Sequence, residues 1–293
     1  MMFLHLSDIH FLRRYPRVEK GYNSIFNCMT SPLIQIKNSL NKINLSEIDF
    51  IIITGDLVES GTSEDYEILK YELENLLGEI PYIITLGNHD NKEAFYKGWF
   101  NKECNEPYNT INDIDGLRII GFDNSIYKNS DGFISDSQYN WLKTQLEISN
   151  NKKTILICHH HLIKNQFTTP SVNYNDGFEE LIRKSSIVGI FTGHTHHSFK
   201  GSFAGKPYFS TGSLSFIGYD EGNGIVRFEE NAQISICKYE DGKISVKVIS
   251  TLEEIKSLGK IDFKKIKMKN KCLVKVLFML IIDIITYNKK GEF

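Results

Sequence analysis

The chain has 293 residues, of which 41% are hydrophobic and 24% are charged, and its formal net charge is -2. This length can bury a large core in one or two domains, and the near-neutral balance excludes the overall positive field typical of nucleic-acid-binding proteins. The five cysteines lie far apart without a C-x-x-C pair, which excludes a thiolate zinc site and a disulfide framework. The chain opens on a short apolar run without the features of a signal peptide, so we expect a cytoplasmic protein.

Strands and helices alternate over the first two thirds of the chain. Short apolar runs typical of buried strands occupy residues 2–6, 49–53, 81–86, 154–157 and 187–191. Helical spacing of apolar residues and helix-start and helix-stop residues predict helices over residues 32–43, 62–77, 93–100, 136–146 and 176–185. A hairpin is expected from residues 108–114 and 117–122, with its turn at Asp115 and Gly116.

The pattern changes after residue 200. Short strands separated by turn residues predict an antiparallel layer, with strands at residues 208–211, 225–228, 232–239 and 244–249. Alternating strands and helices followed by a block of strands predict an α/β sandwich of two sheets. In open α/β sheets, ligands bind beyond the carboxyl ends of the strands.

Polar side chains follow each of the five strands predicted in the first part. They are Asp8 and His10; Asp56; Asn88 and His89; His159; and His194 with His196. Each alone fits a turn or a solvated histidine, but five in order predict one shared metal site. Carboxylate, imidazole and amide ligands suit manganese, iron or zinc. Apart from His89, the set holds seven side chains. These are too many for one catalytic ion with an open position, so they indicate two ions sharing a bridging carboxylate.

The motifs at these strand ends resemble the calcineurin-like metallophosphoesterase superfamily. The resemblance covers about residues 3–211 and rests on Asp8-Ile9-His10, Gly55-Asp56, Gly87-Asn88-His89-Asp90, His159 and Gly193-His194-Thr195-His196. It implies a four-layer α-β-β-α sandwich of two mixed sheets with outer helices, and a dinuclear metal centre at the sheet edge.

The same resemblance implies a role for each residue of the set. Asp8, His10 and His196 would bind the first metal, and Asn88, His159 and His194 the second. Asp56 would bridge both metals, and His89 would act as the catalytic residue that donates a proton or stabilises charge. Two such metals can hold a bridging hydroxide that attacks phosphorus in line.

Within the superfamily, the pattern is most similar to class III cyclic-nucleotide phosphodiesterases and related glycerophosphodiesterases. The similarity rests on the histidine run at 159–161 and on the segment 132–142, whereas Leu162 replaces the proline that often follows the run. We therefore expect a phosphodiesterase that acts on a small nucleotide-like or glycerol-type phosphoester. A phosphomonoesterase or pyrophosphohydrolase on the same scaffold, and a non-catalytic metal-bearing scaffold acting through its tail, remain alternatives. The acidic balance disfavours a nucleic-acid substrate.

The last part of the chain has a different composition. We expect a metallophosphoesterase domain over residues 1–255 and a basic and apolar helical tail over residues 256–293. The apolar stretch at 272–287 contains Lys275 and Asp283 and is shorter than the roughly 20 residues of a spanning helix. Three alternatives remain open for residues 264–290. They can form a helix that lies on an anionic membrane surface, or a helix that packs on the body of the protein or in a homodimer; a membrane span is the third alternative. Membrane association through the tail is the alternative to a purely cytoplasmic location.

Overall fold

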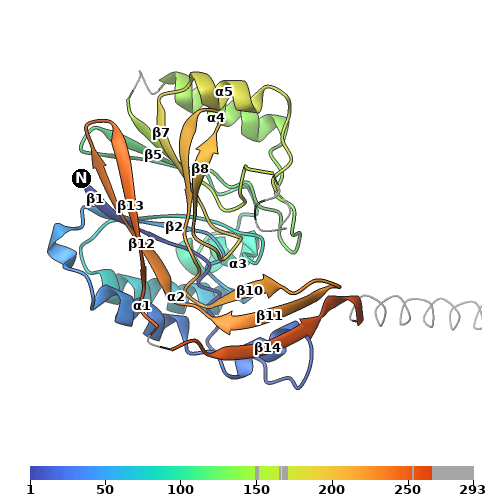
Figure 1. The fold of residues 1–293 in the computed structure, drawn as a ribbon. Coiled ribbons are helices and arrows are strands. Elements are labelled where there is room, and N and C mark those ends of the chain that lie inside the picture. Colours follow the sequence, from blue (N-terminus) through green and yellow to red (C-terminus); the bar gives the residue numbers. More distant parts are fainter. Residues whose placement is uncertain (149–151, 165, 167–170, 253, 266–293) are drawn as a thin grey trace, which may run out of the picture.

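The computed structural model describes residues 1–148, 152–164, 166, 171–252 and 254–265. Two large sheets form its centre (Figure 1). The first sheet has the order β13-β12-β1-β2-β3. Its three strands β1, β2 and β3 are parallel, and β12 and β13 join antiparallel to complete it. The bounds are β1 Met2–Leu6, β2 Phe50–Thr54, β3 Tyr82–Thr85, β12 Gln233–Glu240 and β13 Lys243–Ser250.

The second sheet has the order β4-β5-β6-β7-β9-β8. Strands β5, β6, β7 and β9 are parallel, whereas the edge strands β4 and β8 are antiparallel to their neighbours. The bounds are β4 Thr110–Ile114, β5 Leu117–Gly121, β6 Thr154–Ile157, β7 Ile187–Thr192, β8 Phe199–Phe203 and β9 Lys206–Ser210. Both sheets are therefore mixed, and each contains a run of parallel neighbouring strands.

The two sheets pack face to face through an aromatic and aliphatic core. Phe3 stacks on Phe50 of its own sheet, with ring centroids 4.7 Å apart, and meets Phe191 of the other sheet edge to face. Helices α1 (Pro32–Leu40), α2 (Ser63–Leu77) and α3 (Lys92–Phe100) cover the outer face of the first sheet. Helices α4 (Asp136–Ile148) and α5 (Phe178–Lys184) cover the outer face of the second (Figure 1). The prediction of an α/β fold with mixed sheets and outer helices is confirmed.

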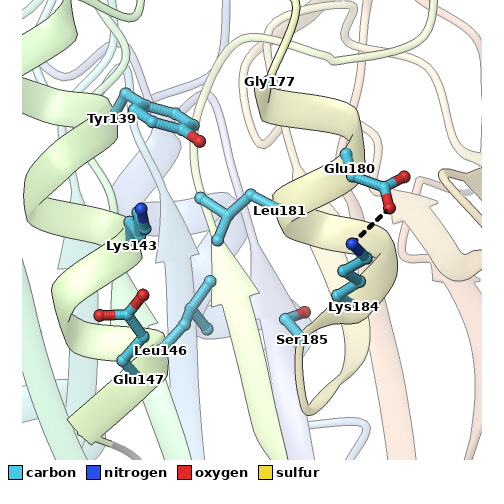
Figure 2. A pocket seen from close by; sticks show the side chains of 9 residues that line it. All are labelled: Tyr139, Lys143, Leu146, Glu147, Gly177, Glu180, Leu181, Lys184 and Ser185. Carbon is cyan, nitrogen blue, oxygen red and sulfur yellow. Dashed lines mark ion pairs between the residues drawn. The ribbon is translucent and has the colours of Figure 1, made fainter.

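A groove of about 420 Å³ lies between α4 and α5 (Figure 2). Leu146 and Leu181 form its apolar floor, and charged side chains such as Lys143 and Glu180 stand at its rim. None of the strand-end residues predicted to bind metal lines this groove.

The strands after residue 200 do not form one antiparallel layer, so that prediction is wrong. Two of them complete the first sheet, two extend the second, and a third sheet of three strands has the order β10-β11-β14. It consists of β10 (Phe216–Asp220), β11 (Ile225–Glu230) and β14 (Ser257–Asp262). The short 3-10 helix η1 (Tyr22–Asn27) packs on it through Ile25 and Phe26. Glycines interrupt the apolar pattern of β10 and β14, which is why neither strand was predicted.

The predicted helical tail begins with a strand, because Ser257–Asp262 pairs with β11. The helix expected from residue 256 is therefore wrong for this stretch. The basic and apolar segment from residue 266 onward lies outside the described residues. Among the helices that are described, none has the length and apolarity needed to cross a membrane. The division between a catalytic domain and a tail stays a prediction.

Candidate metal centre

The loops that follow five parallel strands meet at one edge of the two sheets. Asp8 and His10 follow β1, Asp56 follows β2, and Asn88 and His89 follow β3 in the first sheet. In the second sheet, His159 follows β6, and His194 and His196 follow β7. Because parallel strands end on the same side of a sheet, their loops are neighbours. All eight predicted site residues are brought together here.

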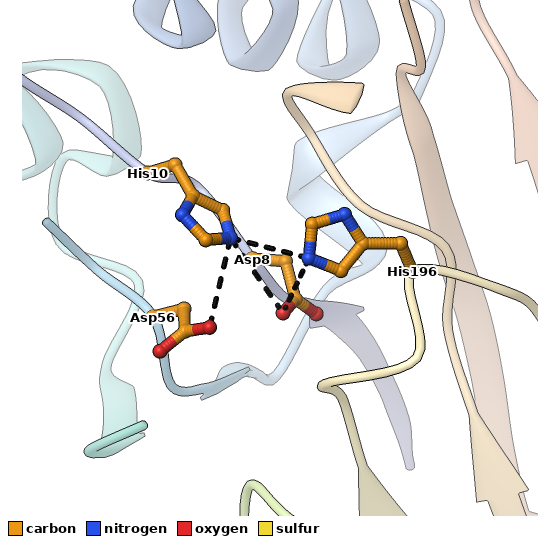
Figure 3. A group of neighbouring side chains, drawn as sticks. All are labelled: Asp8, His10, Asp56 and His196. Atoms are coloured by element: carbon orange, nitrogen blue, oxygen red, sulfur yellow. Dashed lines mark hydrogen bonds and ion pairs between the residues drawn. The ribbon is translucent and has the colours of Figure 1, made fainter. Parts of the chain in front are cut away.

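Asp8, His10, Asp56 and His196 form the first group of candidate ligands (Figure 3). His196 Nε2 lies 3.3 Å from Asp8 Oδ1, and His10 Nε2 lies 3.6 Å from Asp56 Oδ2. The two Nε2 atoms of His10 and His196 are only 3.2 Å apart. All four residues are buried. Four possible ligand atoms thus surround one small volume.

Asp56, His159 and His194 form a second group that shares Asp56 with the first. His159 Nε2 lies 3.2 Å from Asp56 Oδ2 and 3.3 Å from Asn88 Oδ1. His194 Nε2 is buried and has no hydrogen-bond partner among the described residues. An unpaired buried polar atom costs about 1–3 kcal/mol, and a metal ion bound at His194 Nε2 would offset this cost.

Backbone carbonyls fix the tautomers of two of these histidines. His196 Nδ1 lies 2.6 Å from Phe216 O, and His159 Nδ1 lies 2.7 Å from Thr54 O. A carbonyl can only accept, so each Nδ1 donates, and a ring without a second proton turns the lone pair of Nε2 toward the buried oxygens. In the metal-free protein, burial lowers the pKa of His159, but the Asp56 carboxylate outweighs it and raises that pKa to about 9, so a proton occupies the place that a metal ion would take. Lone pairs that face carboxylate and amide oxygens repel one another unless a cation lies between them. The residues present therefore fit divalent metal ions.

The backbone at the candidate ligands is strained. Asp8, His10, Asp56, His194 and His196 all have positive φ angles, between 48° and 69°. Non-glycine residues in this region cost about 1–3 kcal/mol each, and such strain persists at functional sites where the surroundings enforce it. The loops therefore hold these side chains in place at the expense of local stability.

Gly193 allows the β7 loop to approach the β1 loop. A Cβ atom at this position would lie 1.9 Å from Ser7 Oγ and 2.7 Å from Asp8 Oδ2. Only glycine fits between these atoms, since no real Cβ makes contacts this short. The close approach lets His194 N donate to both carboxylate oxygens of Asp8, at 3.2 and 3.1 Å.

Glu59 belongs to the site although the sequence pattern did not identify it. Its Oε2 lies 2.5 Å from His10 Nδ1, and its Oε1 lies 2.9 Å from His89 Nδ1. The carboxylate thus links a candidate metal ligand to the candidate catalytic residue. The sequence offered one indication of this role, namely that Glu59 lies three residues after Asp56 in the same loop. Acidic residues at such a spacing are too common to indicate a site.

His89 lies in a strongly negative environment. Burial lowers the pKa of His89, but the carboxylates of Asp56 and Glu59 outweigh it and raise that pKa to about 10. The ring is therefore protonated at neutral pH in the metal-free protein. Divalent cations beside Asp56 would oppose this shift. Its Nε2 atom, opposite the nitrogen bound by Glu59, is the ring position left to act on a substrate.

Comparison with known proteins agrees with this geometry. The family model described as calcineurin-like phosphoesterase matches residues 1–198. A probable cyclic nucleotide phosphodiesterase of Rhodococcus erythropolis is 32% identical over 165 residues, which cover 54% of this chain and 55% of that protein. A probable glycerophosphodiester phosphodiesterase of Arcobacter nitrofigilis is 30% identical over 210 residues, which cover 67% of this chain and 72% of the relative. The chain thus matches little more than half the length of the first relative.

A solved structure shares the fold. The purple acid phosphatase PPD1 from yellow lupin (Lupinus luteus) superposes with a TM-score of 0.59 over 89% of this chain and 53% of that chain. The sequences are only 12% identical in this alignment. The two proteins are therefore similar in the arrangement of their sheets and helices, and the comparison is limited to the fold.

Proposed function

The chain belongs to the calcineurin-like phosphoesterase family, and from this premise we propose that it is a metal-dependent phosphodiesterase with a dinuclear centre. The observation that carries the proposal is the pair of candidate ligand groups that share Asp56, in which every residue except the partly exposed His194 is buried. A structural site for one ion would not need a second group around the same carboxylate. We propose that its substrate is a small nucleotide-like or glycerol-type phosphodiester.

We assign the ligands as two sets. Asp8, His10 and His196 would hold the first metal; Asn88, His159 and His194 would hold the second; and Asp56 would be shared between them. The short distances among Nε2, carboxylate and amide oxygen atoms support this assignment, as does the unpaired Nε2 of His194. The donor set contains no thiolate, which favours manganese, iron or zinc in a catalytic rather than a structural role.

When bound, two divalent metals lower the pKa of a water molecule toward neutrality and stabilise negative charge on phosphoryl oxygens. The chain's own residues position the rest of the reaction. His89 holds a proton at Nε2, where it can stabilise charge on the phosphoryl group or protonate the leaving oxygen. Glu59 orients this ring through Nδ1 and also orients His10.

The two relatives support a diester substrate, since one is described as a probable cyclic nucleotide phosphodiesterase and the other as a probable glycerophosphodiester phosphodiesterase. A phosphomonoesterase or pyrophosphohydrolase would use the same metal centre. Side-by-side assays of cyclic AMP, a glycerophosphodiester, p-nitrophenyl phosphate and a nucleoside diphosphate separate these activities. Preferential turnover of either diester supports the proposal, whereas preference for the monoester or the diphosphate contradicts it.

Glu59 provides a test of the site that does not change a metal ligand. In Glu59→Gln, the amide group can accept from only one histidine and presents its NH2 to the Nδ1–H of the other. We expect metal affinity to fall about 10- to 100-fold, since outer-shell partners of ligating histidines have effects of this size. Activity titrated against added manganese measures the change. An unaltered titration curve and an unaltered maximal rate would exclude Glu59 from the site.

A further inference from the structure

Residues 122–134 form a segment, here called the strap, that is hydrogen-bonded to two loops of the candidate metal centre. Asn124 brackets the backbone of His160, accepting from its N–H at 3.1 Å and donating to its carbonyl at 3.0 Å. The Lys128 N–H donates to the carbonyl of Asn88 at 2.8 Å. The strap is thus fixed beside His159 at one point and at Asn88 at another, on the side of the proposed second metal.

Lys128 occupies a strained position at the tip of this strap. Its φ angle is +60°, and the turn is closed by a hydrogen bond from Asn129 N to Ile126 O. A lysine has no local hydrogen bond to stabilise this conformation, unlike asparagine or aspartate. The conformation places the backbone of an exposed lysine against the backbone of Asn88, a candidate ligand residue.

The charge of Lys128 is not neutralised by the described residues. Its Nζ lies 4.9 Å from the centre of the adjacent Tyr127 ring, and it forms no ion pair with another described residue. Lys92, at the start of α3, is instead paired with Asp123 of the strap at 2.7 Å and is largely buried. Lys128 is therefore available to bind a charged ligand, whereas Lys92 holds the strap in place.

The neighbourhood of Lys128 suits the ester part of a substrate rather than its phosphoryl group. Ile126 is 41% exposed and lies beside Tyr127 at the same tip. An apolar surface that ends in a flexible cation can pack against an organic group and bind a charge on it. The buried carboxylates of the site cannot bind such a charge.

We propose that Lys128 is a specificity-determining residue that binds a second anionic group, a carboxylate or a further phosphate, on the ester part of the substrate. This inference rests on the proposed function. Among small phosphodiesters, it favours those that carry a second negative charge on an ester group over those, such as cyclic AMP, whose only charge is at the scissile phosphate.

Two matched diesters test the inference. Bis-p-nitrophenyl phosphate has uncharged ester groups, and 4-carboxyphenyl p-nitrophenyl phosphate differs by one carboxylate in place of a nitro group. We expect wild-type protein to favour the carboxylated diester. Lys128→Ala should lower kcat/KM for it about three- to tenfold more than for the uncharged diester, mainly through KM, as for a partly screened charge pair. Lys128→Arg should restore most of the preference, and added salt should reduce it.

Lys37→Ala is the matched control, because Lys37 is an exposed lysine on α1. It should retain the wild-type preference. Equal effects of Lys128→Ala on the two diesters, or none on either, would overturn the inference while leaving the proposed function intact. If wild-type protein loaded with metal hydrolyses neither diester, the proposed function fails and the inference fails with it.

Discussion

Replacement of Asp56 by asparagine is expected to abolish the hydrolysis of bis-p-nitrophenyl phosphate and to lower the amount of bound metal. Asp56 is the side chain shared by both ligand groups, and Oδ2 lies 3.2 Å from His159 Nε2 and 3.6 Å from His10 Nε2. Asparagine keeps the size and one acceptor oxygen but removes the charge. Loss of several kcal/mol of charge stabilisation corresponds to a decrease of about 10³-fold or more in rate.

Elemental analysis and steady-state rates of the purified variant measure both effects. His196→Ala should behave in the same direction, since His196 belongs to one of the two groups. His197→Gln is the control in the same loop, because His197 lies outside both groups and its ring contacts the carbonyl of Gly218. It should retain its metal. An Asp56→Asn protein that still turns over substrate after metal is stripped would refute the mechanism.

Replacement of His89 by alanine should leave the metals bound but slow turnover about 10²-fold or more, the usual size of a general acid–base contribution. His89 is not a member of the two groups that share Asp56, although it lies with His10 and Glu59 in a third group of possible ligand atoms. In the proposed assignment its loss removes a proton and a positive charge rather than a ligand. The rate constant kcat, measured at full metal loading, tests this expectation.

Two kinds of leaving group distinguish the roles open to His89. A nitrophenolate leaves readily without a proton, whereas an alkoxide needs one. A proton donor therefore predicts a larger loss for an alkyl ester than for an aryl ester, and a charge stabiliser predicts equal losses. If the alanine variant reaches the wild-type rate on both esters, His89 takes no part in the chemistry.

The convergence of the candidate metal ligands could be predicted because it depends on a simple rule of sheet geometry. Polar residues such as Asp8, Asp56 and His194 come directly after buried parallel strands, whose carboxyl ends meet at one edge. The order of the strands within the sheets did not need to be known. The candidate ligands come close together because the loops that carry them meet at this edge.

Other parts of the site and fold could not be predicted from residue types. The carbonyls of Phe216 and Thr54 orient His196 and His159, but every residue has a carbonyl, so the sequence carries no signal of this role. Glu59 is one of many acidic residues until the fold brings it against two histidines. The third sheet escaped prediction because β14 is separated from β11 by both strands of the β12–β13 hairpin.

The most direct test of the central claim is a count of metal ions against activity. Metal-free protein is titrated with manganese while bound metal and the hydrolysis of bis-p-nitrophenyl phosphate are followed together. The account predicts two ions per chain at full activity, and fewer in the Asp56→Asn variant. Full activity with a single ion, or with none, would contradict it.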